Sequence, residues 1–319
     1  MRSVALFLLL ALPYNIFYMK LTPLLILCAL PLCFACGDDI DIVRPDKPDK
    51  PAITSDNVNA NPTYNKAYTR LEMPRLRQGN DTILVHRTSG NTVNYITEWD
   101  IDKKSQRWSC YVMNRALAQQ NVTRYYSEDN QYPRDPLIPL SMQWAEDPYW
   151  YNGKKLDHGH ICPSADRLSS FDMNYQTFFL TNMQPQFNVF NTGLWAKLEK
   201  KVRIIASTCD TLYVCKGGTI DEGKYGGYNK VYSRLGNGLI MPRYFFMALL
   251  RLNNGRYNAI GIWTDQITNA HDSGQHMAQY AISIDELEKR TGIDFFCNLT
   301  DAIEDRVEKA FGSAVSWGL

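Results

Sequence analysis

Short stretches in which apolar and polar residues alternate, separated by turn residues, are spread along the chain from about residue 81. Such stretches are typical of β-strands that belong to one sheet. The residues between them, such as Gly90-Asn91 and Asn253-Asn254-Gly255, favour turns. The pattern predicts strands at 81–88, 91–100, 107–114, 177–186, 210–220, 243–252 and 257–264.

Three other stretches, 193–207, 283–292 and 301–311, have the apolar spacing of helices. Ser283 and Glu286 stand three residues apart, which is the spacing of a capping box, and Gly292 is suited to end that helix. Trp195 and Leu198 fall on the apolar face of the helix at 193–207. The chain is therefore expected to have an α+β fold, with helices flanking a mixed, largely antiparallel sheet.

The N-terminal 36 residues read as a leader. An apolar run at Leu21–Phe34 follows Met19-Lys20 and ends at Ala35-Cys36, which is the layout of a secretory signal with a lipoprotein cysteine. We therefore expect Met19 to be the true start and Cys36 to carry a lipid anchor to the membrane. The expected location is the cell envelope, on the outer membrane or the cell surface. A plain cleaved signal and a membrane-spanning helix are the alternatives.

Residues 37–63 are rich in Pro, Asp, Lys and Asn and lack apolar periodicity, so they are expected to form a disordered tether. Residues 64–319 contain no second linker and no internal repeat, which predicts a single domain.

The charge of the chain sets a limit on how it can attract a polyanion. The formal net charge is +1, but without Arg2 and Lys20 of the leader there remain 32 basic and 33 acidic residues. No global basic field is present, so a nucleic-acid partner would need a local patch. Lys197, Lys200, Lys201 and Arg203 could form one, although a solvated helix face is the simpler interpretation.

Chemistry-bearing residues gather between Leu156 and Arg203. They are His158, His160, Asn182, Asn191, Glu199 and Arg203. At about 100° per residue, Glu199 and Arg203 lie on one helix face, with Asn191 near its start. A histidine that takes a proton from water, oxygen ligands for a hard cation and an arginine that neutralises charge suit a phosphodiester substrate.

Three blocks carry a family resemblance. They are "DHGH" at 157–160, "TNMQPQ" at 181–186 and "NTGLWAKLE" at 191–199. In this order and spacing they resemble the DNA/RNA non-specific endonuclease family, which includes Serratia-type secreted nucleases and mitochondrial endonuclease G. Weaker similarity extends from about Asn94 to the C-terminal tail.

The resemblance implies a ββα-metal (His-Me finger) nuclease that cleaves DNA and RNA by contacts to the phosphate backbone. His160 is the expected general base, and Asn191 the direct ligand of Mg²⁺, with Mn²⁺ as the alternative ion. Glu199 is expected to hold a metal-bound water, and Arg203 and His158 to neutralise phosphate oxygens. Asn182 is expected to support the site. The oligomeric state stays open.

One block departs from the family pattern, because His158 stands where the family usually has arginine. The charge of a histidine depends on pH, whereas an arginine is always charged. The change leaves open a catalytically weakened lipoprotein that binds nucleic acid. A hydrolase of another class, such as a phosphatase, is a further alternative.

Several of these residues also have simpler interpretations. Asn191 could cap the helix, Glu199 could pair on the surface with Lys200 or Arg203, and Asn182 could only orient the site.

The five cysteines after Cys36 are an odd number, and none has zinc-ligand spacing. Cys209 with Cys215, or Cys209 with Cys297, are the leading candidates for a disulfide. A catalytic role for Cys162, two residues after His160, is the weakest of the alternatives.

Overall fold

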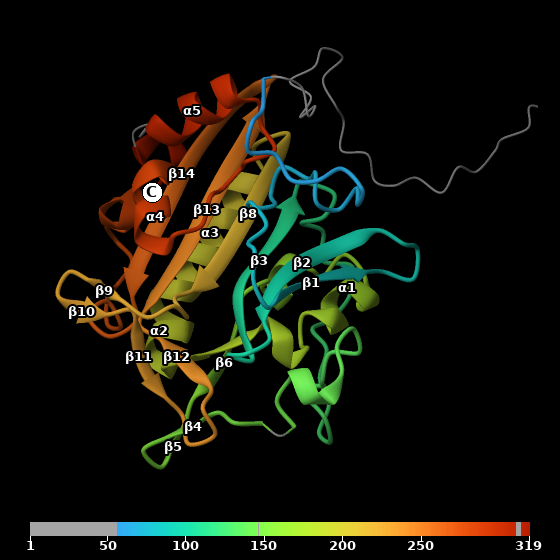
Figure 1. Cartoon of the computed structure of the whole chain (residues 1–319), viewed down its shortest axis with the longest axis vertical. Helices are drawn as coiled ribbons and strands as arrows, with labels where there is room; N and C mark the ends of the chain where they lie inside the picture. The colour runs from blue at the N-terminus through green and yellow to red at the C-terminus, as the bar shows by residue number, and fades with distance from the viewer. Residues whose placement is uncertain (1–55, 146, 311–313) are drawn as a thin grey trace, which may run out of the picture. The chain divides into compact units, whose positions relative to one another are not determined.

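A seven-stranded antiparallel sheet lies at the centre of the part of the chain that the structure describes (Figure 1). The strand order is β1-β2-β3-β8-β13-β14-β15, and every neighbouring pair runs antiparallel. The strands are β1 (Asp81–Arg87), β2 (Val93–Asp100), β3 (Ser105–Met113), β8 (Thr211–Gly218), β13 (Tyr244–Asn253), β14 (Arg256–Asp265) and β15 (Ala281–Ile282). The six predicted strands other than 177–186 are confirmed, as is the α+β class.

The structure is a computed structural model that describes residues 56–145, 147–310 and 314–319. The leader, Cys36 and the tether up to residue 55 lie outside this part. Among the described residues, no helix is both long enough and apolar enough to cross a membrane.

Both faces of the sheet are buried, because successive side chains of its central strands enter two different cores. On β13, Phe245 and Met247 pack into one core, while Phe246 and Ala248 pack into the other. The first core includes Leu198 of α3 (Ala196–Ala206). The second includes residues of α4 (Ile284–Thr291) and α5 (Asp301–Lys309). The helices therefore lie on opposite faces of one sheet.

The predicted ends of α4 are confirmed. The Ser283 side chain accepts a hydrogen bond from the Glu286 backbone N–H at 3.1 Å. Gly292 follows the helix with φ of 74°, a left-handed conformation that suits glycine.

The segment expected to be a strand at 177–186 is mostly not one. It forms a short 3₁₀ turn at Leu180–Asn182 and then β7 (Met183–Gln186), which pairs with β6 (Asp157–His160) in a separate two-stranded sheet. The following helix starts earlier than predicted, as α2 (Asn188–Phe190), and leads through a π-helical turn (Asn191–Trp195) into α3, with a kink at Gly193, where the backbone is not helical. The hairpin and helix together are the ββα unit that the family resemblance implies.

The remaining described elements are short and lie in the connections. They are β4 (Trp150–Tyr151), β5 (Lys154–Lys155), β9 (Lys224–Tyr225), β10 (Tyr228–Asn229), β11 (Val231–Arg234), β12 (Ile240–Pro242), α1 (Phe171–Gln176) and 3₁₀ turns at Leu140–Met142, Ser164–Asp166, Met277–Tyr280 and Ala314–Trp317.

The predicted boundary between tether and domain at Tyr64 is too late. Asn57 is buried, and its side-chain amide donates hydrogen bonds to the carbonyls of Cys297 (3.0 Å) and Leu299. Asn61 is also buried and donates to the Pro74 carbonyl at 2.9 Å. These asparagines satisfy carbonyl groups of distant loops, which a polar composition alone does not reveal.

All five cysteines within the described residues have free thiols, so the predicted pairings of Cys209 are wrong. Cys215 lies in the core under α4 and α5, and Cys297 Sγ lies 3.8 Å from the carbonyl oxygen of Met73 in the same core. Cys209 packs against the core on the α3 face. The sheet itself separates these sulfur atoms.

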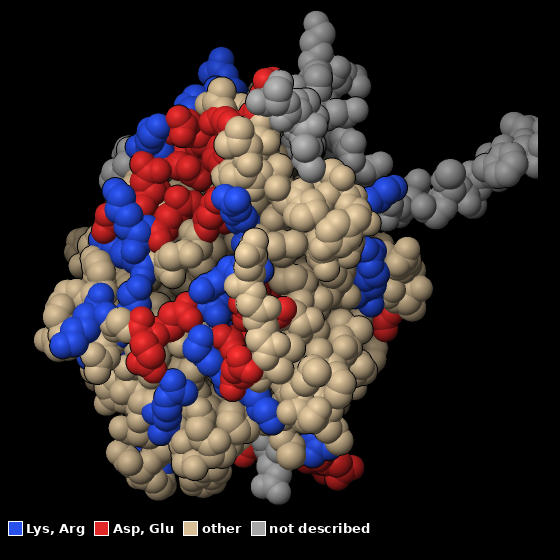
Figure 2. Space-filling model, viewed as in Figure 1, with Lys and Arg blue, Asp and Glu red and all other residues tan. Residues whose placement is uncertain are grey.

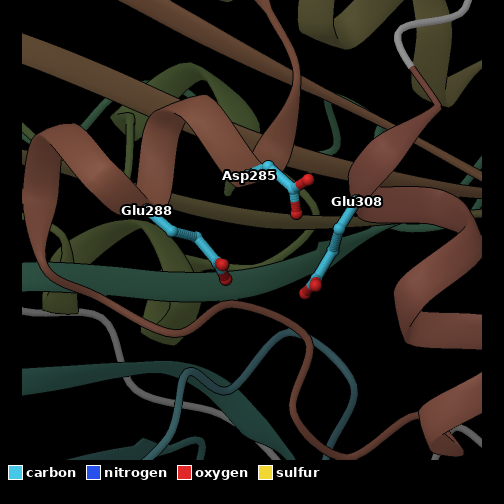
Figure 3. A group of neighbouring side chains, drawn as sticks. All are labelled: Asp285, Glu288 and Glu308. Carbon is cyan, nitrogen blue, oxygen red and sulfur yellow. The ribbon is translucent and has the colours of Figure 1, made fainter.

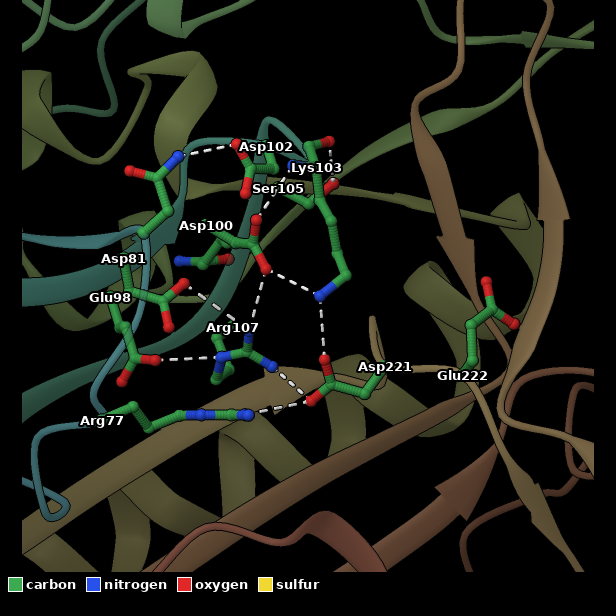
Figure 4. Close-up of polar contacts among 12 residues, drawn as sticks. Arg77, Asp81, Glu98, Asp100, Asp102, Lys103, Ser105, Arg107, Asp221 and Glu222 are labelled. Carbon is green, nitrogen blue, oxygen red and sulfur yellow. Dashed lines mark hydrogen bonds and ion pairs between the residues drawn. The ribbon is translucent and has the colours of Figure 1, made fainter.

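A network of charges around Arg107 ties β2 and β3 to the loop after β8 (Figure 4). The buried guanidinium pairs with Glu98 and Asp100, each at 2.9 Å, and with Asp221. Lys103 bridges Asp100 (2.7 Å) and Asp221 (3.0 Å). Burial raises the pKa of Glu98 to about 7, and Arg107 opposes that effect. In this network the buried carboxylates pair with arginine and lysine side chains of the same chain.

Candidate active site

An open cleft of about 820 Å³ lies where the β6–β7 hairpin meets the helical segment α2–α3. It brings together four of the residues singled out from the sequence: His158, His160, Asn191 and Glu199. The other lining residues are Arg124, Tyr132, Lys155, Leu156, Asp157, Pro163, Ser164, Ala165, Asn188, Thr192 and Ala196. Asn182 and Arg203 are not among them.

The hairpin needs the glycine of its first block. A Cβ on Gly159 would lie only 2.3 Å from Cδ of Gln186, the last residue of β7, which pairs with Asp157. No side chain fits in that space. Gly159 thus lets β6 and β7 approach closely, with His158 and His160 on either side of it.

His160 is held in one orientation at the end of β6. Its Nδ1 lies 3.2 Å from the His158 carbonyl, and because a carbonyl only accepts, Nδ1 carries the proton. Nε2 then has a lone pair, and it has no hydrogen-bond partner among the described residues. Burial, together with the charge of Arg124, lowers the pKa of His160 to about 3. The imidazole is therefore neutral and able to accept a proton.

Asn182 anchors the turn that follows His160. Its side chain accepts from the Cys162 backbone N–H at 2.9 Å and donates to the carbonyls of Cys162 (2.9 Å) and Thr177 (2.8 Å). It is fully buried and does not face the cleft. Its geometry agrees with the alternative in which Asn182 orients the site.

Asn191 is not the N-cap of a helix. It has helical dihedral angles and follows directly on α2, two residues before the kink at Gly193. Its Nδ2 donates to Asp157 Oδ2 at 2.8 Å, and Asn188 donates to the same oxygen at 3.0 Å. The Asn191 amide nitrogen is thus engaged, which leaves Oδ1 as an oxygen donor at the cleft. A π-helical turn of this kind is frequent at functional sites.

Glu199 does not make the surface pair considered from the sequence. Its Oε1 accepts a 2.6 Å hydrogen bond from Lys216 Nζ, and the Lys216 side chain is 0% exposed. Lys216 also lies 4.8 Å from the centre of the Trp195 ring. Burial raises the pKa of Glu199, and the charge of Lys216 opposes this shift. The lysine keeps a carboxylate at the base of the cleft.

Arg203 is turned away from the cleft. Its Nη1 pairs with the fully buried Asp166 carboxylate at 2.7 Å. Asp166 in turn accepts from the Tyr111 hydroxyl at 2.8 Å. The guanidinium that lines the cleft belongs to Arg124, whose Cζ lies 4.8 Å from the Phe178 ring. The edge of His160 packs on the same phenylalanine, with 4.9 Å between ring centres.

His158 is enclosed by aromatic rings. Its imidazole stacks between Tyr132, at 3.6 Å between centres, and Tyr149, at 4.0 Å. Its Nε2 lies 2.9 Å from Asp147 Oδ2. Burial alone would raise the pKa of Asp147, but His158 brings it below the usual value. The ring lines the cleft, yet a carboxylate already stands beside its outer nitrogen.

Cys162 is poorly suited to nucleophilic catalysis. It is fully buried, and burial raises the pKa of its thiol to about 12. A thiol in this environment stays protonated at neutral pH, so the alternative of a catalytic cysteine has no support here.

The sequence did not point to two residues that line the cleft, Arg124 and Asp157, or to Lys216, which pairs with Glu199 from β8. A lysine inside the apolar run 210–220 was the available signal for Lys216, since a buried lysine needs a partner. Asp157 stood in the first block, but nothing in the sequence showed that it reaches Asn191. Arg124 comes from a loop without any distinguishing pattern.

The model of one protein family, described as DNA/RNA non-specific endonuclease, matches residues 79–302. The chain belongs to this family. It is a non-specific endonuclease that acts on DNA and RNA.

Individual relatives agree. A nuclease from Nostoc is 28% identical over 221 residues, covering 67% of this chain and 75% of the relative. The Serratia marcescens nuclease is 26% identical over 207 residues, covering 63% and 72%. Human mitochondrial endonuclease G is 30% identical over 156 residues, covering 47% and 51%.

Among solved structures, one described as the crystal structure of the EndoG/EndoGI complex matches with a TM-score of 0.60. The match covers 76% of this endonuclease and 96% of that chain, at 18% identity, and so supports the fold. Within this fold, the three sequence blocks of the endonuclease lie on β6, on β7 and its preceding turn, and on the helical segment after β7.

Proposed function

We propose that the endonuclease hydrolyses phosphodiester bonds with His160 as the general base. The observation that carries this proposal is the tautomer: Nδ1 is engaged by the His158 carbonyl, and Nε2 is left with a lone pair at the cleft. Nε2 would take a proton from the attacking water. A bound phosphate would offset the positive charge of Arg124, which depresses the basicity of the ring in the free protein.

The family is generally dependent on a divalent metal, and the oxygen donors of the cleft fit a hard cation. Asn191 would offer Oδ1, because Asp157 engages its nitrogen, and Glu199 would act through a bound water. We favour Mg²⁺, with Mn²⁺ as the alternative, since few protein ligands suffice for an ion that keeps its waters. When bound, such an ion supplies positive charge that stabilises the phosphate in the transition state.

The remaining residues hold or complement these groups. Lys216 keeps Glu199 ionised, Asp157 orients Asn191, and Asn182 fixes the backbone after His160. Arg124 would neutralise the non-bridging phosphate oxygens, a role that the sequence suggested for Arg203. Arg203 would act through Asp166 instead.

Contacts to phosphate carry no base information, which is consistent with cleavage that ignores sequence. A catalytically weakened protein that binds nucleic acid is a second candidate. It rests on His158, which replaces an arginine and stands beside Asp147. The two candidates differ in turnover and not in binding.

A plasmid-nicking and RNA-cleavage assay, run with Mg²⁺, with Mn²⁺ and after exhaustive chelation, tests the function. Cleavage of both polymers that stops on chelation supports the metal-dependent endonuclease. Tight binding with no nicking at any metal concentration would favour the weakened binder, and full cleavage after chelation would remove the metal from the mechanism.

We also propose that the endonuclease is exported and anchored through a lipid on Cys36, on the basis of the apolar run at Leu21–Phe34 and the cysteine that follows it. Mass spectrometry of the mature protein tests this. A mature chain that begins elsewhere, or an unmodified Cys36, would refute the anchor and leave the nuclease activity untouched.

A further inference from the structure

A cluster of acidic side chains lies on α4 and α5. These two helices cover the sheet face opposite α3 (Figure 1). Figure 2 shows Asp and Glu gathered over these two helices, with Lys and Arg around the margin of the patch. An exposed acidic patch alone would be ordinary, because such groups are well solvated. Part of this cluster is not exposed.

Three carboxylates of the cluster converge on one point (Figure 3). Asp285 and Glu288 stand three residues apart on α4 and share one side of it, while Glu308 reaches them from the end of α5. One oxygen from each lies within 4.8 Å of the others. Oxygens at this spacing can all reach a single ion at about 2.3–2.6 Å.

Glu308 is the independent observation that distinguishes this cluster from a surface patch. It is 8% exposed, and its covered Oε1 has no hydrogen-bond partner among the described residues. A buried carboxylate oxygen without a partner costs considerable free energy. In Figure 3 the Glu308 side chain points toward Asp285 and Glu288, so the unsatisfied group is aimed into the cluster.

Two basic residues close in sequence form ion pairs with acids outside the group of three. Arg290 pairs with Glu286 at 2.8 Å, and Lys309 pairs with Asp305 at 2.9 Å. Glu288 accepts only a backbone hydrogen bond, from Phe295 N at 2.7 Å, and no ion pair of Asp285, Glu288 or Glu308 is present in the described part of the chain.

A second group of three, Asp294, Glu304 and Glu308, adjoins the first and shares Glu308 with it. The carboxylates of this group have hydrogen-bond and ion-pair partners. The Asn59 amide donates to Glu304 at 3.0 Å and to Asp294 at 3.3 Å, and Arg75 lies 3.7 Å from Asp294. The group without hydrogen-bond or ion-pair partners from other side chains is therefore the first one, Asp285, Glu288 and Glu308.

We propose that Asp285, Glu288 and Glu308 bind a divalent cation of the calcium class at a structural site separate from the cleft. The donors are all oxygens, they come from two different helices, and they leave room for waters. Ca²⁺ accepts roughly six to eight oxygen ligands in irregular geometry, whereas Mg²⁺ demands a near-octahedral shell. The ion fastens α5 to α4, and it takes no part in cleavage.

Calorimetric titration and thermal melting of the full endonuclease with CaCl₂ test the site. Asn191→Ala serves as the background, so that an ion in the cleft does not contribute. We expect one Ca²⁺ per chain and a midpoint raised by about 5 °C or more at an ion concentration ~100-fold above Kd. Mg²⁺ at the same concentration should give less than half that shift.

Glu308→Gln and Asp285→Asn, each in the same background, should weaken Ca²⁺ binding at least about tenfold and abolish most of the shift. Asp305→Asn removes an exposed carboxylate from α5 outside the cluster and is the matched control, with an unchanged response. Asp285 is only half-buried, so its variant remains informative if Glu308→Gln fails to fold.

The proposal is overturned if the Asn191→Ala protein binds no Ca²⁺, if the cluster variants respond as fully as Asp305→Asn, or if Mg²⁺ matches Ca²⁺. In the wild-type background, Glu308→Gln should leave the rate of DNA cleavage in Mg²⁺ within about twofold. These readouts do not depend on the proposed mechanism of the cleft.

Discussion

The cleft and the acidic cluster both bury carboxylates, but they treat the charge in different ways. In the cleft, Glu199 pairs with Lys216 at 2.6 Å, and the charge of the lysine opposes the rise that burial causes in the pKa of Glu199. In the cluster, the covered Oε1 of Glu308 has no hydrogen-bond partner among the described residues, and burial raises the pKa of Glu308 to about 9. A carboxylate paired within the chain is ready for water-mediated contacts with an ion, whereas an unpaired one needs an external cation or a proton.

The two regions should also differ in what a mutation changes, the rate of cleavage or the stability of the fold. Residues of the cleft are positioned by hydrogen bonds from the second block and from β8, so changes there should alter turnover. Residues of the cluster join two helices on the other face of the sheet, so changes there should alter the free energy of unfolding. The following predictions test this division, starting with the largest effect.

Asn191→Ala removes the amide oxygen proposed as the metal ligand. Cleavage of plasmid DNA at saturating Mg²⁺ should fall by about 10²–10³-fold, the range for loss of one group that stabilises transition-state charge. Circular dichroism should show an intact fold. A folded variant that cleaves at more than a tenth of the wild-type rate would show that Asn191 does not hold the ion.

Asp157→Asn keeps the size of the side chain but removes the charge that orients Asn191 and Asn188. Partners that orient a ligand typically contribute about 10–100-fold to metal affinity. The Mg²⁺ concentration for half-maximal cleavage should rise by that factor, with a smaller change in the maximal rate. An unchanged metal dependence would contradict the positioning role.

Glu308→Gln should stabilise the endonuclease in calcium-free buffer at pH 8. The pKa of Glu308 in the folded protein is about 9, above the ordinary value near 4.3. Protonated Glu308 costs no stability below about pH 4.3, but the folded state loses stability relative to the unfolded state as pH rises from there toward 9. Neighbouring acids titrate with it, so we expect a gain of about 1–3 kcal/mol.

Denaturant melts at pH 8 and at pH 4.5 measure this gain, which should nearly vanish at the lower pH. Saturating Ca²⁺ should reverse the order and make the wild type more stable. Equal stability of the two proteins at pH 8 would mean that the carboxylate is not strained.

His158→Arg should raise cleavage by less than about tenfold, because a guanidinium is always charged and can bind a phosphate bidentately. A guanidinium can stack between Tyr132 and Tyr149 as the imidazole does, and it keeps its charge. A pH–rate profile of the two proteins checks this. Equal or lower rates of the variant across the whole range would show that His158 does not replace the arginine.

Sequence patterns predicted the parts of this protein that depend on local order. The alternation of strands, the capping of α4 and the meeting of His160, Asn191 and Glu199 could be predicted, because the residues lie within one hairpin and helix. The π-helical turn could not, since the pattern around Asn191 is that of an ordinary helix start.

Contacts between segments that are distant in the sequence could not be predicted from such patterns. Lys216 reaches Glu199 from a central strand, and Arg203 turns to Asp166 rather than to the cleft. The cluster shows the same limit: the spacing of Asp285 and Glu288 puts them on one helix face, but only the packing of α5 on α4 brings Glu308 to them.

The proposed role of His160 is tested most directly by the single-turnover rate of plasmid nicking in Mg²⁺, measured side by side for His160→Ala and Glu308→Gln with equal folded fractions. Loss of the base should slow His160→Ala by about 10²–10⁴-fold, while Glu308→Gln keeps the wild-type rate. Near-normal nicking by a folded His160→Ala protein would contradict the assignment of this cleft as the catalytic centre.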